Sequence, residues 1–229
     1  MTNAAEFWEQ RYLSRRDERG QVWSGRVNPT VEREVQHLAP GTALELGSGE
    51  GGDALWLAAR GWTVTALDIS PAALAVGAGQ AAARGLADRI AWVQSDLVAW
   101  HPDAEYDLVT SAFLHAPFAF PREEILRRAR DAVAPGGRLL VVGHGEPPAG
   151  SDHRHAAEGP PLPTPDAVLA ALRLPGDWTV ETNALVGREA ALADGSVIEV
   201  TDTVVKVRRP ERRQTDASAG RPAEASRSF

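Results

Sequence analysis

Two histidines follow apolar runs and have the residue type needed for acid–base chemistry. His115 comes after the run Asp107–Ser111, and His144 comes after the run Arg138–Val142. An imidazole titrates close to neutral pH, so either ring could remove a proton from a hydroxyl, thiol or amine group. If both runs are parallel strands, both histidines lie at the carboxyl edge of one sheet. The competing interpretation is a pair of neutral, hydrogen-bonded rings in a pocket wall.

A glycine-rich loop is the strongest local signal in the chain. Residues 43–53 read ALELGSGEGGD, which predicts a buried strand, a loop and the start of a helix. Glycine lets the backbone approach a ligand closely, so this junction predicts a nucleoside-cofactor site. The dinucleotide pattern GxGxxG fits from Gly47, and the pattern ExGxGxG fits from Glu45, so the glycines alone leave both open. Asp68 closes the next apolar run, where a carboxylate can accept hydrogen bonds from two ribose hydroxyls of either cofactor.

The elements that must position these residues alternate between strand and helix, which predicts a parallel sheet. Five runs have the apolar character of buried parallel strands, at residues 43–46, 63–67, 90–93, 107–111 and 138–142. Helices are expected at residues 4–16, 53–60, 70–84 and 121–134, and glycines at positions 61, 85 and 136 are expected to follow three of them. After a Pro- and Gly-rich stretch come a helix at 166–172 and an antiparallel pair at 178–183 and 197–207.

Composition sets limits on the kind of protein. The 229 residues are 43% hydrophobic and include no cysteine, which excludes a disulfide framework, thiolate zinc sites and cysteine nucleophiles. The opening MTNAAEFWEQRYLSRRDERG has neither a basic start nor an apolar core, and no apolar run of 18 residues occurs. We therefore expect a cytoplasmic protein without a signal peptide or a membrane span.

The charge is distributed unevenly along the chain. Residues 208–229 contain six arginines and three acidic residues, so residues 1–207 carry a net charge of −10. An acidic surface repels phosphate backbones, which argues against a nucleic-acid partner. Residues 208–229 lack apolar periodicity, and we expect a disordered basic tail after a single domain at residues 1–207. A nucleic-acid-binding arm is the alternative for this tail.

Further motifs occur in a characteristic order. The third strand is followed by Ser95-Asp96-Leu97, the fourth strand begins within YDLV at residues 106–109, and APGG at residues 134–137 precedes the fifth. The chain opens with FWEQRY, some 40 residues ahead of the glycine loop. Together with ExGxGxG, these motifs resemble class I S-adenosylmethionine-dependent methyltransferases, and in particular the small-molecule branch that includes tellurite and thiopurine methyltransferase relatives.

The resemblance implies an α/β, Rossmann-like, doubly wound sheet of seven strands. The sheet is expected to be mostly parallel, with an antiparallel C-terminal strand, helices on both faces and a helical cap over about residues 1–40. The cofactor is expected to be S-adenosylmethionine, with Glu45 near its methionine moiety, Asp68 at the ribose and Asp96 at the adenine amino group. The full set of expected cofactor-binding residues is Tyr12, Trp23, Glu45, Gly47, Ser48, Gly49, Gly51, Asp68, Ile69, Asp96, Leu97 and Ser111.

The expected reaction is an in-line transfer of a methyl group to an O, S or N atom of a small molecule. His115 and His144 are the candidate catalytic residues, in a pocket between the opening helix and the loop at residues 145–165. His153 and His155 lack a nearby carboxylate cluster, so we expect no metal site. The protein is expected to be a monomer or a homodimer.

Two alternatives to an active methyltransferase stay open. A non-catalytic S-adenosylmethionine-binding subunit would have the same sequence pattern. A nicotinamide-dependent reductase of the short-chain type would need a Tyr-x-x-x-Lys pair. The single lysine, Lys206, has Asp202 four residues before it, which disfavours that reductase.

Overall fold

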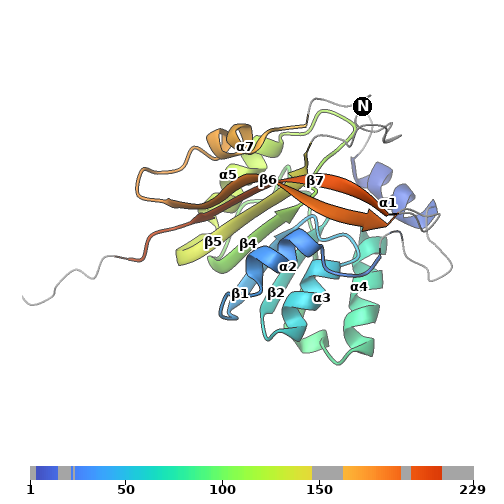
Figure 1. Cartoon of the computed structure of the whole chain (residues 1–229). Coiled ribbons are helices and arrows are strands. Elements are labelled where there is room, and N and C mark those ends of the chain that lie inside the picture. Colours follow the sequence, from blue (N-terminus) through green and yellow to red (C-terminus); the bar gives the residue numbers. More distant parts are fainter. Residues whose placement is uncertain (1–3, 15–21, 23, 146–161, 192–196, 213–229) are drawn as a thin grey trace, which may run out of the picture.

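The structure, a computed structural model, describes residues 4–14, 22, 24–145, 162–191 and 197–212. Seven strands form one sheet in the order β3-β2-β1-β4-β5-β7-β6 (Figure 1). Strands β1 to β5 pair in parallel, whereas β7 is antiparallel to both β5 and β6. The strands are β1 (Thr42–Leu46), β2 (Thr63–Asp68), β3 (Ile90–Gln94), β4 (Tyr106–Ala112), β5 (Val133–His144), β6 (Thr179–Ala191) and β7 (Val197–Arg208). The predicted seven-stranded, mostly parallel sheet is confirmed.

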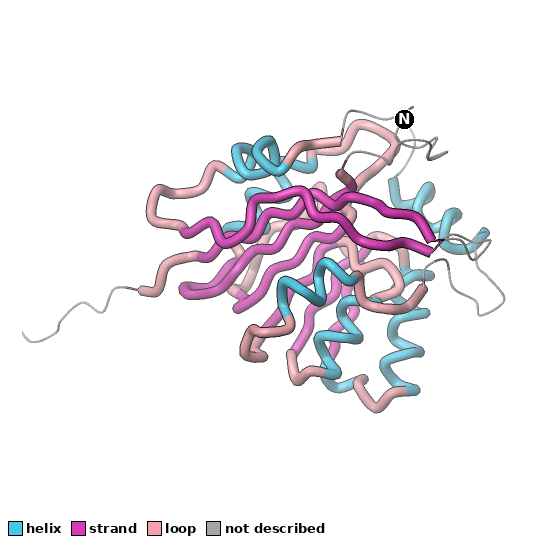
Figure 2. Tube along the Cα trace, viewed as in Figure 1, coloured by secondary structure: helices cyan, strands magenta, loops and turns pink. Residues whose placement is uncertain are grey.

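Helices cover both faces of the sheet (Figures 1 and 2). Helices α2, α3 and α4 pack on one face, which we call the front face, and α5 and α7 pack on the other, the back face. Helix α1 lies against α4. The helices are α1 (Ala4–Ser14), α2 (Pro29–Val35), α3 (Gly52–Ala59), α4 (Pro71–Ala83), the short 3₁₀ helix η1 (Ala87–Arg89), α5 (Arg122–Asp131) and α7 (Pro165–Leu172).

Strand β1 divides its side chains between the two faces. Ala43 belongs to the front core, and Leu44 and Leu46 belong to the back core. Because side chains alternate along a strand, Glu45 points to the front face, where α3 begins. A carboxylate is thereby buried in a position that an apolar residue would ordinarily occupy.

Helix α2 lies within the helical cap predicted for about residues 1–40, but it was not predicted as a separate helix, although its start has the expected chemistry. The side chain of Asn28 accepts hydrogen bonds from the amides of Thr30 at 2.8 Å and Val31 at 3.3 Å. Pro29 occupies the first turn, where its missing N–H costs nothing. An Asn-Pro pair before an apolar residue was therefore the signal for this helix.

Two boundaries differ from the expectation for physical reasons. Helix α5 ends at Asp131, three residues before its predicted end, because Val133 already pairs with Tyr106 in the sheet. Gly136 has a φ of 80°, but it lies inside β5, beside a register shift between β4 and β5, and does not end the helix. Strand β6 continues to Ala191, eight residues past its predicted end, because a half-exposed edge strand needs few apolar residues.

The start of the predicted disordered tail was wrong. Arg208 is the last residue of β7 and pairs with Arg138 of β5. The amide of Arg209 donates to the carbonyl of Gly137 at 3.0 Å. The guanidinium groups of Arg209 and Arg212 contact the Glu105 carboxylate at 2.8 Å and 3.1 Å. The chain is thus docked through residue 212, and residues 213–229 lie outside the described part.

Candidate active site

The glycine loop joins β1 to α3 at the carboxyl edge of the sheet. Gly47, Gly49 and Gly51 have φ angles of 72°, 53° and 76°, a conformation that side chains with a Cβ rarely adopt. The amides of Gly47 and Ser48 donate to the carbonyl of Leu67 at 2.8 Å and 2.9 Å. The loop is thus fastened to the end of β2 in the open form that a closely approaching ligand requires.

Trp92 of β3 supports this loop from the side. A Cβ atom added to Gly51 or to Gly77 of α4 would overlap the indole ring of Trp92. The ring therefore fills the space between the loop and α4, and two positions without side chains are needed to admit it. Sequence reasoning missed Trp92 because its apolar strand position suggested only core packing.

Asp68 connects the loop to the next helix. It is 7% exposed, and its Oδ2 accepts from the amide of Gly49 at 2.8 Å while its Oδ1 accepts from the amide of Ser70 at 2.9 Å. Burial raises the pKa of Asp68 above its ordinary value, and the amide hydrogen bonds work against that rise. Each carboxylate oxygen has a second lone pair, so Asp68 can still accept hydrogen bonds from a ligand.

Two further carboxylates lie in the same buried region. Burial, followed by the charges of Asp53 and Asp68, raises the pKa of Glu45 well above its ordinary value. Burial also raises the pKa of Asp53 to about 6. The Oε2 atom of Glu45 is buried and has no hydrogen-bond partner in the described part of the chain. Three buried carboxylates, two of which disfavour the ionisation of Glu45, form a site suited to a cationic ligand.

A short segment before α2 crosses the glycine loop; we call Val22 and residues 24–28 the crossing segment. The amide of Val22 donates to both carboxylate oxygens of Glu50, at 2.9 Å and 3.0 Å. The amide of Asn28 donates to Oδ1 of Asp53 at 2.7 Å. A Cβ on Gly52 would overlap the carbonyl of Arg26, so the segment lies directly on the loop. Sequence reasoning missed Glu50 and Asp53, and the predicted residue Trp23 lies outside the described residues.

Helix α1 lies beside the N-terminus of α4. The Oε2 atom of Glu9 accepts from the hydroxyl of Ser70 at 2.6 Å and from the amide of Ala72 at 3.2 Å. Tyr12 is 6% exposed and has its ring 6.5 Å from the ring of Trp8. The opening helix is therefore held near Asp68 by a hydrogen bond to the neighbouring Ser70.

Asp96 lies just beyond the end of β3, where its carboxylate is exposed and accepts from the amide of Val98 at 2.9 Å. Leu97 is buried in the back core. Ile69 is half-buried between Asp68 and Ser70. These three residues follow β3 and β2 at the same edge of the sheet as the glycine loop.

Ser111 lies apart from Glu45. It is 1% exposed, and it follows Val109 of the back core at the spacing that places both side chains on one face. Glu45 faces the opposite side of the sheet. The structure therefore does not bring the Ser111 hydroxyl together with the Glu45 carboxylate.

The two histidines lie together at the carboxyl edge. Their rings are stacked, with centroids 5.6 Å apart and planes at 21°. The amide of His144 donates to Nε2 of His115 at 3.4 Å. Burial, with the nearby charges of Arg122 and His144, lowers the pKa of His115 to about 4. His115 is therefore neutral at physiological pH, and its Nε2 lone pair is already used by a backbone amide.

Phe113 joins the histidines to strand β6. It has a φ of 53°, unusual for a residue with a side chain, and its ring centroid lies 4.6 Å from that of His144. The guanidinium carbon of Arg188 lies 5.7 Å from the centre of the Phe113 ring.

His153 and His155 fall outside the described residues, within which no group of three or more potential metal ligands occurs.

The sequence matches one known domain family over the same region. The family described as "Methyltransferase domain" matches residues 43–137, which run from β1 through the glycine loop to the start of β5. Over these residues the chain has a methyltransferase domain. The sheet order and the glycine loop at the end of β1 agree with this assignment.

Two characterised relatives share about half of this chain. A demethylmenaquinone methyltransferase from Thermus thermophilus is 38% identical over 116 residues, which cover 49% of this chain and 51% of the relative. A 2-heptyl-1-hydroxyquinolin-4(1H)-one methyltransferase from Mycobacteroides abscessus is 32% identical over 127 residues, 52% of this chain and 54% of the relative. The chain thus spans about half the length of these relatives.

Solved structures extend the similarity of the fold beyond that domain. A protein described under the conversion of a disulfide bond into a thioacetal group during echinomycin biosynthesis superposes with a TM-score of 0.66 and 23% identity, over 91% of this chain and 94% of that one. The S-adenosylmethionine-dependent methyltransferase SibL has a TM-score of 0.53 and 25% identity, over 81% and 53%. The methyltransferase fold therefore includes the C-terminal strands β6 and β7.

Proposed function

We propose that this chain transfers the methyl group of S-adenosylmethionine to a small-molecule acceptor. The observation that carries the proposal is the glycine loop packed against three buried carboxylates. Such a site binds a ligand that needs close backbone approach and also bears positive charge. S-adenosylmethionine meets both requirements, because it is a nucleoside with an amino group and a sulfonium.

The residues present fit this cofactor. The unpartnered Oε2 of Glu45 can accept a hydrogen bond from the ammonium group of the methionine moiety. Asp68 has free lone pairs for two ribose hydroxyls, and Asp96 is exposed at the end of the neighbouring strand for the adenine amino group. Gly47, Gly49 and Gly51, with Ser48, would line the nucleoside; Tyr12, Ile69 and Leu97 would complete the walls. When bound, the cofactor supplies an electrophilic methyl group.

His144 and His115 would have different tasks in the reaction. His115 is neutral, and its Nε2 accepts the amide proton of His144. A ring used in this way orients its neighbour and is a poor base. We assign proton removal from the acceptor to His144 and its orientation to His115. Most of the rate would come from holding the acceptor about 3 Å from the methyl carbon in a site without water.

The two relatives support a small-molecule acceptor. Their names describe oxygen-bearing quinone and quinolone compounds. The acidic body of this chain, with a net charge of −10 over residues 1–207, disfavours a nucleic-acid acceptor.

No helix among the described residues has the length and apolar character to cross a bilayer. The cysteine-free composition is compatible with the reducing cytoplasm, where we place the protein.

Calorimetry with the reaction product tests the proposal. The purified chain should bind S-adenosylhomocysteine and not NAD, and it should release methylated product from a mixture of small phenols, thiols and amines supplied with S-adenosylmethionine. Binding of NAD without binding of S-adenosylhomocysteine would overturn it. Binding of the product without any methyl transfer would favour a non-catalytic cofactor-binding subunit instead.

A further inference from the structure

The β6–β7 hairpin extends beyond the rest of the sheet at its carboxyl edge. Strand β5 ends at His144, which pairs with Asp202 of β7. The β7 residues before Asp202, numbers 197–201, pair with residues 187–191 of β6, and among the described residues their one backbone bond to the other side is from the Gly145 amide to the Thr201 carbonyl at 2.8 Å. These two segments, which we call the overhang, therefore project past His144 toward the cofactor-binding edge (Figure 1).

One face of the overhang is apolar apart from a single arginine. Arg188 pairs with Val200, and Ala190 pairs with Ile198. Residues paired across an antiparallel ladder share a face, so these four residues form one surface, continuous with the Val186–Asp202 and His144 positions. Glu189 and Glu199 are paired with each other and lie on the opposite, exposed face.

Arg188 is held in place by buried partners. Its Nε donates to Oδ2 of Asp202 at 2.7 Å, and Asp202 is 0% exposed. The same Oδ2 atom accepts the hydroxyl proton of Thr30 of α2 at 2.7 Å, which fixes the carboxylate between helix and hairpin. The guanidinium also lies near the face of Phe113, whose ring contacts His144. Arg188 is therefore pre-oriented beside the candidate catalytic histidine.

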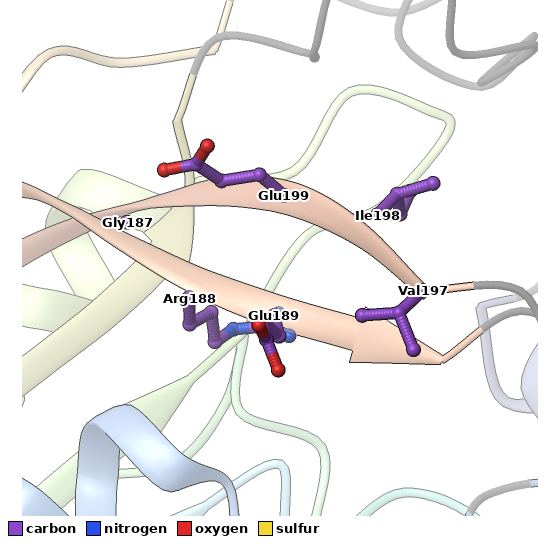
Figure 3. Close-up of a pocket in the computed structure, with 6 residues that line it drawn as sticks. All are labelled: Gly187, Arg188, Glu189, Val197, Ile198 and Glu199. Atoms are coloured by element: carbon purple, nitrogen blue, oxygen red, sulfur yellow. The ribbon is translucent and has the colours of Figure 1, made fainter.

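The terminal nitrogens of Arg188 are available for a ligand. In the described part of the chain only Nε has a hydrogen-bond partner, and the side chain is 19% exposed. A surface groove at the hairpin is lined from both faces, by Gly187, Arg188, Glu189, Val197, Ile198 and Glu199 (Figure 3), so it is distinct from the apolar face that carries Arg188. A guanidinium with two free terminal N–H₂ groups is suited to bind a planar, anionic oxygen group.

We infer that Arg188 selects the acceptor, and that the acceptor is an apolar molecule bearing an anionic oxygen group such as a carboxylate or an enolate. This inference rests on the proposed function. The apolar face of the overhang would contact the apolar part of the acceptor. The terminal N–H₂ groups of Arg188 would bind the oxygen group of the acceptor. When an anion attacks a sulfonium, both charges are neutralised. A largely apolar pocket therefore also favours the reaction. Arg188 is thus a specificity-determining residue.

The test compares two probes of equal size, 2-naphthoate and the neutral 2-naphthamide, by calorimetry on the full chain with and without S-adenosylhomocysteine. The wild-type protein should bind the carboxylate at least about tenfold more tightly than the amide. The variant Arg188→Gln should bind both probes with equal affinity. Arg138→Gln is the matched control, because Arg138 also contacts a carboxylate through Nε but lies in the middle of β5, six residues before His144. It should keep the wild-type preference.

Removing Arg188 leaves the buried Asp202 without its cation, so Arg188→Gln can lose stability. The double variant R188Q/D202N replaces the ion pair with two neutral hydrogen-bonding side chains and provides the same test. A carboxylate preference that persists in the variants, or a wild-type protein that binds the two probes equally or binds neither, overturns the inference. The preference for the carboxylate probe is also measured without S-adenosylhomocysteine. A protein that prefers the carboxylate but does not bind S-adenosylhomocysteine would refute only the proposed function.

Discussion

The amide of His144 donates to Nε2 of His115 across 3.4 Å, so the two histidines that the chain places at neighbouring strand ends are not equivalent. The ring of His115 accepts a hydrogen bond from the backbone of His144. The ring of His144 contacts both His115 and Phe113, with its centroid 4.6 Å from that of Phe113. Under the proposed function, these stacked rings at the ends of adjacent parallel strands would divide into one that orients and one that reacts.

Substitution of the two histidines should separate these tasks. His144→Gln should lower kcat by about 10²–10⁴, the usual contribution of a general base, with unchanged affinity for S-adenosylhomocysteine. His115→Gln keeps a hydrogen-bond acceptor and should retain most of the activity, whereas His115→Ala should lower it. Steady-state kinetics over pH 5–9 would measure both effects. Equal loss in the two Gln variants would contradict the division.

Asp68→Ala should weaken binding of S-adenosylhomocysteine by at least about 100-fold, because two charge-assisted hydrogen bonds to the ribose would be lost. Asp107→Ala is the control: Asp107 accepts from the amide and hydroxyl of Thr42 at 2.8 Å and 2.9 Å, at the opposite edge of the sheet. It should cost stability without changing the affinity. Calorimetry with melting curves would show both, and an Asp68→Ala protein of normal affinity would refute the ribose assignment.

Two glycine substitutions should have opposite effects. Gly51→Ala forces a Cβ into the Trp92 ring at a φ of 76°, so it should destabilise the protein by at least about 1–2 kcal/mol and reduce cofactor affinity. Gly79 of α4 has open space around it, so Gly79→Ala should stabilise by about 0.5–1 kcal/mol. Urea unfolding would measure both. A neutral Gly51→Ala would show that Trp92 moves aside.

The raised pKa of Asp53 predicts a pH-dependent stability. Burial raises it from 3.8 to about 6, so the folded state holds a proton that the unfolded state has released. The stability contributed by this group is present below about pH 4 and is lost as pH rises to about 6. Asp53→Asn keeps an acceptor for the Asn28 amide and should remove this loss. It should become more stable than wild type by up to about 3 kcal/mol at pH 7, with little difference at pH 4. A stability difference independent of pH would contradict the shift.

Truncation should locate the end of the folded chain. Ending the protein after Arg212 keeps the contacts of Arg209 and Arg212 with Glu105 and should leave the Tm unchanged. Ending it after Val207 removes the backbone hydrogen bonds between Arg209 and residues Gly136 and Gly137 of β5 and should lower the Tm by several degrees. Equal Tm values for the two truncations would restore the earlier expectation that the chain is undocked from residue 208.

The sequence predicted well those parts of the molecule that depend on local chemistry. The five parallel strands and the loop glycines with positive φ follow from apolar runs and from the conformational freedom of glycine. Contacts between distant segments could not be read in this way. Trp92 beneath Gly51, the Val22 amide on Glu50 and Arg188 on Asp202 join residues 41, 28 and 14 positions apart, and nothing in their local sequences indicates a partner.

The crossing segment also has a kinetic meaning. Its amides are bonded to Glu50 and Asp53, two carboxylates that belong to the loop and helix start beneath it. A cofactor seated on the loop would lie next to a segment whose release must break these bonds, whereas the overhang belongs to strands β6 and β7, which β4 and β5 separate from β1. If the chain has the proposed function, we expect acceptor and methylated product to exchange while the cofactor stays in place, so that the cofactor binds first and leaves last.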